Sequence, residues 1–329
     1  MMQEIEPSLQ DGLSAFDRVP DGFSHEAFVY TTSQEFLAGT VPFILQGLER
    51  DEQVLALLSS EKMELLQTEM AKNAHRVRFM DMATIGANPA RIMPVWMRFV
   101  DERLPGRGVR GIGEPIHAAR GSAELVECQQ HESLLNHAFD STPAFRLLCP
   151  YDVALGPEVL EEAARSHPFV YNTGRVVPSM GWGLEGGAAR PHEAALPSPP
   201  ASFEQLAFAM GQLHDVRALV THHAAAAGFD AERTSDVVLA VNEVATNSLR
   251  HGGQRGTLTV WHEGPTLICE VHDTGHIADP LAGRRIPSPA AVGGYGLWLV
   301  NHLCDLVQVR TGPGGSVIRL HVRPNLATR

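Results

Sequence analysis

Short apolar runs alternate with longer amphipathic segments along residues 25–172. Runs with the length and the β-branched or aromatic content of strands lie at residues 25–30, 53–59, 76–82, 109–115, 145–152 and 169–172. Residues 35–49 and 89–103 have apolar residues at helical spacing, and the first of these follows Thr32, whose spacing to Glu35 fits a capping box. This alternation predicts an α/β domain with a mostly parallel sheet and helices on both faces.

The pattern changes beyond residue 201. Residues 203–228 predict a helix or a helix pair, and residues 235–253 predict another helix. Strand patterns at 256–264 and 267–275 are followed by a Gly/Pro/Arg-rich loop at 276–293, a helix at 295–305 and strands at 306–312 and 316–322. This order predicts an α+β sandwich. Because residues 184–201 are rich in Gly, Pro and Ala, we expect domains at 22–172 and 202–323, joined by a linker at 173–201.

Composition and charge narrow the class of protein. The chain is 44% hydrophobic and 19% charged, which is typical of a globular protein. No apolar run approaches the roughly 18 residues of a membrane span, and the acidic start lacks the pattern of a signal peptide, so we expect a cytoplasmic protein without membrane contact. Nearly all of the net charge of −12 lies in residues 1–199. An acidic surface repels phosphate backbones, which argues against direct nucleic-acid binding.

The helix predicted at 235–253 has a polar stripe on an otherwise apolar surface. At 100° per residue, Glu243 and Asn247 lie one turn apart, opposite a side formed by Val237, Val238, Val241, Val244, Ala245, Ser248 and Leu249. A solvated face is the ordinary alternative for such a stripe. The stripe therefore needs support from other motifs.

Two motifs further along the chain supply that support. The strand predicted at 267–275 ends with Asp273, and Gly275 follows where a ligand could approach the backbone. Gly293, Gly294 and Gly296 open the apolar helix near residue 295, where backbone N–H groups and the helix dipole favour an anion. Each motif alone is weak, but Glu-x-x-x-Asn, Asp-x-Gly and Gly-x-Gly-Leu in this order form a specific combination.

On these motifs, residues 202–323 resemble the GHKL (Bergerat-fold) ATPases, and more narrowly the anti-sigma factor serine/threonine kinases. The resemblance implies that Asn247 holds Mg²⁺ on the phosphates of ATP and that Glu243 is the general base for a partner hydroxyl. It implies that Asp273 and Gly275 bind adenine and that residues 276–293 form the lid over ATP. It also implies that Gly293, Gly294, Gly296 and Leu297 bind the nucleotide, with the glycines at phosphate.

Two positions qualify this resemblance. The family usually has Gly-Thr near the last strand, whereas this chain has Gly315 and Ser316, so Ser316 is expected near the nucleotide as an imperfect substitute. Arg217 matches an arginine that the family uses near the catalytic and partner surface, and an ordinary surface arginine is the alternative.

Three functions remain open for this domain. The first is a kinase that phosphorylates a Ser or Thr of a STAS-type anti-sigma antagonist and sequesters a sigma factor, as a homodimer in the family picture. The second is an ATP-dependent sequestering protein without significant kinase activity. The third, a sensor histidine kinase, needs a dimerisation hairpin of about sixty residues, and only about thirty-five residues lie between the linker and Asp236.

The N-terminal domain has no nucleotide motif of its own. The turn after its first strand pattern contains no glycine, and neither Lys62 nor Lys72 belongs to a P-loop motif. Segments within residues 22–172, among them those at 109–139 and 147–154, resemble the MEDS family of sensory domains, which are RecA-like modules without a P-loop. This resemblance implies a small-molecule ligand of unknown identity.

Candidate residues for the sensory ligand lie within this domain. Glu124, Cys128 and His131 share one helical face, for which a buried polar face is favoured over a metal site because zinc ligands usually show tighter paired spacing. We select Glu114 and His131 as the sensory candidates.

Overall fold

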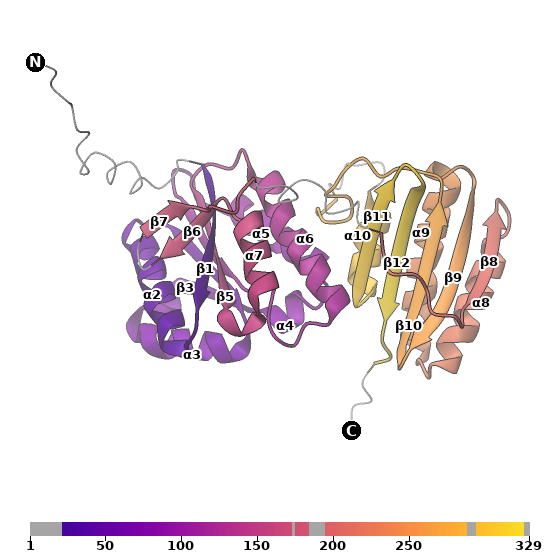
Figure 1. Cartoon of the computed structure of the whole chain (residues 1–329), viewed down its shortest axis with the longest axis horizontal. Coiled ribbons are helices and arrows are strands. Elements are labelled where there is room, and N and C mark those ends of the chain that lie inside the picture. The colour runs from indigo at the N-terminus through magenta and orange to yellow at the C-terminus, as the bar shows by residue number, and fades with distance from the viewer. Residues whose placement is uncertain (1–21, 173–174, 184–194, 288–293, 326–329) are drawn as a thin grey trace, which may run out of the picture. The chain divides into compact units, whose positions relative to one another are not determined.

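The computed structural model describes residues 22–172, 175–183, 195–287 and 294–325. The chain divides into two compact units. The first comprises the described parts of residues 1–84 and 98–189, and the second those of residues 85–97 and 190–329. Each unit is built on one β-sheet (Figure 1).

The sheet of the first unit has seven strands in the order β3-β2-β4-β5-β1-β6-β7. All neighbouring strands are parallel except β6 and β7. The strands are β1 (Phe23–Tyr30), β2 (Gln53–Leu58), β3 (Val77–Asp81), β4 (Val109–Gly113), β5 (Phe145–Asp152), β6 (Phe169–Asn172) and β7 (Arg175–Pro178). The prediction of a mostly parallel α/β sheet is confirmed.

Helices cover both faces of this sheet, with α2 and α3 on one side and α6 and α7 on the other (Figure 1). The helices of this part of the chain are α2 (Ser33–Glu49), α3 (Ser60–Met70), α4 (Met82–Ile85), α5 (Ile92–Asp101), α6 (Ser122–Phe139) and α7 (Pro157–Ser166), with 3₁₀ turns η1 (Ala71–Arg76), η2 (Pro89–Arg91) and η3 (Val153–Leu155). Of these, η2 and residues 92–97 of α5 belong to the second unit. Thr32 caps α2 by accepting a hydrogen bond from the Glu35 N–H, and the Glu35 carboxylate accepts from the Thr31 N–H. A capping loop thus occupies the position of a P-loop.

Burial on both faces explains why these strands are apolar along their length. In β1, Phe28 and Tyr30 pack with Phe36 and Phe43 of α2. His25 lies on the opposite face, against α6. The alternation along β1 therefore sends one set of side chains to each helical layer.

The second unit has an antiparallel sheet in the order β11-β12-β10-β9-β8. Its strands are β8 (Glu204–Ala209), β9 (Arg255–Glu263), β10 (Thr266–Asp273), β11 (Leu306–Gly312) and β12 (Gly315–Val322), and its helices are α8 (Leu213–Ala226), α9 (Ala231–His251) and α10 (Tyr295–Leu303). The apolar sides of these helices form one core with the sheet. The α+β prediction is confirmed.

Two elements differ from the sequence prediction. Residues 204–209 form the edge strand β8 rather than the start of a helix, because Phe208 is buried while its neighbours Ala207 and Ala209 are not, which is the period of a strand. Strand β7 lies inside the predicted linker, where it pairs with β6. Residues 173–174 and 184–194 of that linker lie outside the described residues.

Among the described helices, none combines the length and the apolar character needed to cross a membrane.

Candidate nucleotide-binding site

Helix α9 brings Glu243 and Asn247 to the start of α10. Asp230 caps α9 by accepting a hydrogen bond from the Arg233 N–H. The opposite side of the helix enters the core, so Glu243 and Asn247 remain half-buried at its edge. A Cβ placed on Gly296 would lie 3.1 Å from Asn247 Nδ2 and 3.3 Å from Glu243 Oε2. The polar stripe therefore faces the glycine-rich entry to α10 and is not a plain solvated face.

Asp273 ends β10 and is held by two hydrogen bonds. The Ser248 hydroxyl donates to Oδ2 at 2.5 Å, and the Gly275 N–H donates to Oδ1 at 2.7 Å. These donors fix the carboxylate but leave it further lone pairs, so it can still accept a hydrogen bond from a ligand. The helical period predicts that Ser248 is buried, and this is confirmed. Its hydrogen bond to Asp273 joins two elements and is not predicted by that period.

Gly275 allows the chain to turn tightly beside Asp273. A Cβ at this position would lie 2.8 Å from the His251 carbonyl oxygen and 2.9 Å from Gly252 Cα. Any other residue would have to displace backbone. The turn is also held by Ser316, whose hydroxyl donates to the Gly275 carbonyl at 2.9 Å and lies 3.0 Å from Thr311 Oγ1. Ser316 therefore lies at the start of β12, beside the cavity, and stabilises the turn at Gly275.

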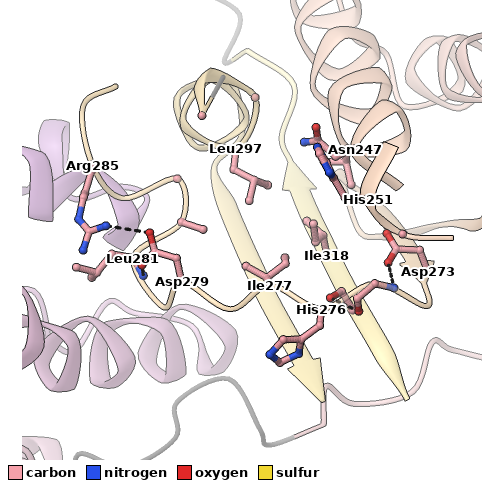
Figure 2. Close-up of a pocket in the computed structure, with 18 of the residues that line it drawn as sticks. Asn247, His251, Asp273, His276, Ile277, Asp279, Leu281, Arg285, Leu297 and Ile318 are labelled. Atoms are coloured by element: carbon pink, nitrogen blue, oxygen red, sulfur yellow. Dashed lines mark hydrogen bonds and ion pairs between the residues drawn. The ribbon is translucent and has the colours of Figure 1, made fainter. Parts of the chain in front are cut away.

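These side chains surround a cavity of about 550 Å³ (Figure 2). Its polar lining includes Asn247, Asp273 and Ser316. Its apolar lining is contributed by Val244, Ile277, Leu281, Leu297 and Ile318. The volume falls within the range of small-molecule sites, and an apolar wall with a few converging polar groups is the usual composition of such sites.

The cavity has one side made by the predicted lid. Leu281 of this segment is buried, and Arg285 forms an ion pair with Asp279 at 2.9 Å while remaining half exposed. Residues 288–293, including the predicted phosphate contact Gly293, lie outside the described residues. Gly294 caps α10 with φ of +86°, a conformation that favours glycine, and both Gly294 and Gly296 line the cavity.

Glu243 lies beside the cavity, next to Gly296, and neither Glu243 nor Arg217 belongs to the cavity lining. Arg217 is exposed on α8 and donates from Nη1 to Asn242 Oδ1 at 3.0 Å. Asn242 directly precedes Glu243 on α9. The structure thus places Arg217 near the predicted general base, on the outer surface of the two helices.

The two sensory candidates of the first unit do not share a site. Glu114 lines a cavity of about 560 Å³ together with Tyr30, Lys62 and His117, whereas His131 is buried on α6 and is absent from that lining. The Tyr30 hydroxyl donates to Glu114 Oε1 at 3.1 Å, and the Lys62 ammonium contacts the same oxygen. Burial raises the pKa of Glu114, against the effect of Lys62. Glu114 therefore remains a candidate ligand contact.

Comparison with known proteins assigns both halves of the chain. Residues 24–168 match the MEDS family, described as the methanogen/methylotroph, DcmR sensory domain, and residues 206–322 match the histidine kinase-like ATPase domain. One solved structure with similarity is that of the RsbU and RsbW domains of Rv1364c from Mycobacterium tuberculosis, with 19% identity and a TM-score of 0.28. The match covers 38% of this chain and 33% of that one. No curated protein matches. The chain therefore joins a MEDS domain to a histidine kinase-like ATPase domain of the GHKL type.

Proposed function

We propose that the ATPase domain binds Mg·ATP in the cavity and transfers its γ-phosphoryl group to a Ser or Thr hydroxyl of an anti-sigma antagonist of the STAS type. The same domain would sequester a sigma factor in the cytoplasm, as a homodimer. A ligand of the MEDS domain would shift the balance between sigma-factor binding and phosphorylation of the antagonist. One observation carries the proposal. Glu243 and Asn247 meet the glycine-rich start of α10 at one side of a cavity that also contains the carboxylate of Asp273.

The cavity has chemically different parts suited to the parts of ATP. Asp273 offers a fixed acceptor for the amino group of adenine, and Ile277 and Ile318 provide apolar surface for the base. Gly294 and Gly296 offer backbone at the N-terminus of α10, where the N–H groups and the helix dipole favour phosphate. ATP would therefore bind with its base at Asp273 and its phosphates at α10.

Asn247 has the position and the chemistry to bind the metal. Its side chain lies on the cavity wall next to Gly296, and an amide oxygen is a ligand type that Mg²⁺ accepts. Asn247 would hold Mg²⁺ at this position, and the ion would offset the negative charge of the phosphates.

Glu243 is suited to act on the protein substrate rather than on ATP. Its carboxylate is next to Gly296 but outside the cavity lining, so a hydroxyl that approaches the γ-phosphate from the surface would pass it. As general base, Glu243 would take the proton of that hydroxyl while its oxygen bonds to the γ-phosphorus, the bond to the β–γ bridging oxygen breaks and ADP leaves. Arg217, bound to the neighbouring Asn242, would contact the incoming protein.

The described part of the chain does not favour a histidine kinase. In a histidine kinase, a dimerisation hairpin precedes the ATPase domain. Here residues 204–209 form β8, a strand of the ATPase sheet itself. A histidine kinase also needs an exposed phosphoacceptor histidine, whereas His223 on α8 lies within hydrogen-bonding distance of Glu204, at 3.0 Å, and of His262, at 3.1 Å.

The test is transfer of labelled γ-phosphate from Mg·ATP to a panel of STAS-type antagonist proteins by the full-length chain. Glu243→Gln should reduce transfer by about 10²- to 10⁴-fold, because a general base contributes on that order. Glu232→Gln, on the exposed first turn of the same helix, is the matched control and should transfer normally.

The outcomes separate the kinase from a sequestering protein. Labelling that requires Glu243 supports the kinase. ATP binding without labelling of any antagonist favours the ATP-dependent sequestering protein, and normal labelling by Glu243→Gln contradicts the role given to Glu243.

A further inference from the structure

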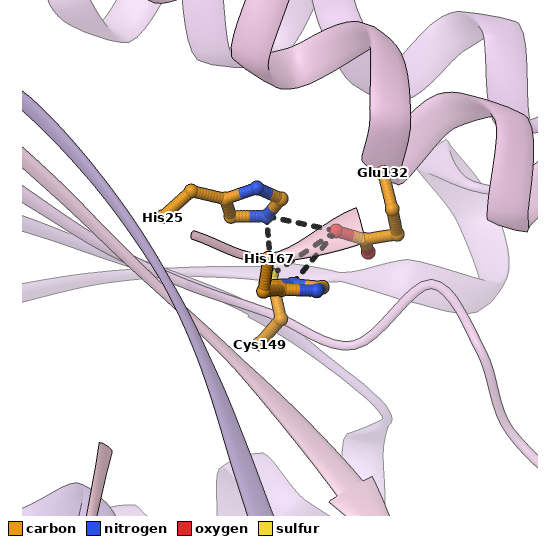
Figure 3. A group of neighbouring side chains, drawn as sticks. All are labelled: His25, Glu132, Cys149 and His167. Carbon is orange, nitrogen blue, oxygen red and sulfur yellow. Dashed lines mark hydrogen bonds and ion pairs between the residues drawn. The ribbon is translucent and has the colours of Figure 1, made fainter. Parts of the chain in front are cut away.

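Four buried side chains with metal-binding atoms meet in the first unit, away from its cavity (Figure 3). His25 is on β1, Cys149 on the neighbouring strand β5, Glu132 on α6, and His167 directly after α7. All four are at most 2% exposed. One ligand atom from each lies within 4.8 Å of the others. The fold thus gathers four residues that are separated by up to 142 positions in the sequence.

The hydrogen bonds around the two histidines determine which nitrogen of each ring faces this cluster. Asn136 donates from Nδ2 to the Ser166 carbonyl at 2.7 Å, so its Oδ1 must be the atom that lies 3.1 Å from His25 Nδ1. His167 Nδ1 lies 2.8 Å from the Ala163 carbonyl oxygen. An amide or carbonyl oxygen can only accept, and the Ser166 hydroxyl near His167 Nδ1 donates to the Glu162 carbonyl, so each Nδ1 must carry the proton. In neutral imidazoles the Nε2 atoms then have only lone pairs to offer.

Both Nε2 lone pairs are directed at an atom that also has only lone pairs. Glu132 Oε2 lies 2.9 Å from His25 Nε2 and 3.4 Å from His167 Nε2. His167 Nε2 and Glu132 Oε1 form no hydrogen bond within the described residues. Cys149 Sγ lies 3.4 Å from both His25 Nε2 and Glu132 Oε2, and its one proton can satisfy a single acceptor. With both imidazoles neutral, the cluster therefore lacks a positive charge to balance Glu132.

We propose that His25 Nε2, His167 Nε2, Cys149 Sγ and Glu132 Oε2 bind one divalent metal ion of the zinc class. In a tetrahedral zinc site with the usual bond lengths, neighbouring ligand atoms are about 3.2–3.7 Å apart. These four of the six ligand-atom distances are 2.9–3.4 Å, and the other two are at most 4.8 Å, so metal binding requires side-chain shifts of up to about 1 Å.

Charge and supporting contacts agree with this assignment. Binding releases the Cys149 proton to solvent, and the thiolate, the carboxylate and the divalent ion then sum to zero charge, which suits a buried position. A histidine whose second nitrogen donates to a carbonyl or amide oxygen is the usual arrangement of a metal ligand, because that bond fixes the ring. With four protein ligands the site is closed, so its role is to join β1, β5, α6 and the end of α7.

The alternative is a buried ion pair in which His25 or His167 is protonated on both nitrogens and binds Glu132. It uses the same residues without a metal, and the thiol of Cys149 then remains protonated and donates to Glu132. The two cases differ in metal content and in the state of the sulfur.

The test is the metal content of the full-length chain, measured by mass spectrometry after expression with added zinc and removal of loosely bound ions. We expect one metal per chain in the wild type and in Cys128→Ala, and at least about a tenfold loss in Cys149→Ala. Cys128 is the matched control because it is equally buried, on α6, and its thiol donates to the Pro115 carbonyl instead. Equal metal content in both variants overturns the proposal.

A second measurement needs no variant. The wild-type chain loaded with Co²⁺ should show the charge-transfer absorption of a thiolate ligand and the strong visible bands of tetrahedral cobalt. A chain that takes up no Co²⁺, or that binds it without a thiolate band, overturns the proposal and leaves the ion pair. Neither measurement involves ATP or a phosphoacceptor, so the result is independent of the kinase activity proposed above.

Discussion

The nucleotide cavity and the buried histidine cluster both bring polar side chains together, but they are encoded differently. The cavity uses motifs that lie within residues 243–318 and take their meaning from spacing along helices and strands. The cluster uses single residues from four elements, and only the parallel packing of β1 beside β5 brings His25 near Cys149. Local motifs can therefore identify a site on consecutive elements, whereas a buried site made by tertiary packing cannot be recognised from the sequence pattern.

The largest effect is expected from the carboxylate at the centre of the buried cluster. Glu132→Ala removes the group shared by His25, Cys149 and His167, and leaves their polar atoms buried without it. Removing one member of a buried charged group costs about 3–5 kcal/mol in the free energy of unfolding. Chemical denaturation of the full-length chain measures this cost.

The loss of stability in Glu132→Ala is expected to affect the first unit and not the nucleotide cavity. ATP affinity should be unchanged in Glu132→Ala under conditions where the chain remains folded, and exposed Glu158 on α7 provides the control substitution Glu158→Ala. A variant as stable as the wild type would show that the cluster contributes nothing to the fold.

The next largest effect is expected at the nucleotide cavity. Asp273→Asn replaces the acceptor expected to bind the adenine amino group and weakens the bonds from Ser248 and Gly275. Loss of a charge-assisted hydrogen bond costs about 1.5–3 kcal/mol, which is roughly a 10- to 150-fold loss of ATP affinity. Isothermal titration of ATP and of inorganic triphosphate should show that only ATP binding is weakened. Equal loss for both ligands would place the base elsewhere.

The smallest effect on ATP affinity is expected from the loss of one hydrogen bond that holds the Asp273 carboxylate. Ser248→Ala removes the donor to Asp273 Oδ2 but leaves the carboxylate and the Gly275 N–H in place. A single supporting hydrogen bond contributes about 0.5–1.5 kcal/mol, so ATP affinity should fall by roughly 2- to 10-fold. A loss as large as that of Asp273→Asn would mean that Ser248 contacts the ligand itself.

Much of this fold could be predicted because its elements have regular periods. The parallel strands of the first unit are continuous apolar runs, and α9 repeats its buried residues every three or four positions. The strand β8 differs from the predicted helix because only residues 210–212 separate it from α8, so the apolar residues of the two elements lie close together in the sequence. Residues at the edge of a sheet have few buried positions, so their period is weak.

The sites show the same limit in more detail. The stripe of Glu243 and Asn247 was predicted because both residues lie on one helix, whereas the contact from Ser248 to Asp273 joins two elements and could not be predicted from either. On α6, the sequence pattern favours His131, whereas the adjacent Glu132 belongs to the buried cluster. The sequence neighbours of Glu132 say nothing of His25 and His167, which reach it only in the folded sheet.

The most direct test of the nucleotide site is the dependence of ATP affinity on Mg²⁺, measured by titration calorimetry on the full-length wild type and on Asn247→Ala. If Asn247 holds the metal on the phosphates, Mg²⁺ should tighten ATP binding in the wild type, and Asn247→Ala should lose most of that gain while binding metal-free ATP as before. If the wild type binds ATP equally with and without Mg²⁺, or if the variant keeps the full gain, Asn247 is not the metal ligand and the account of this site is wrong.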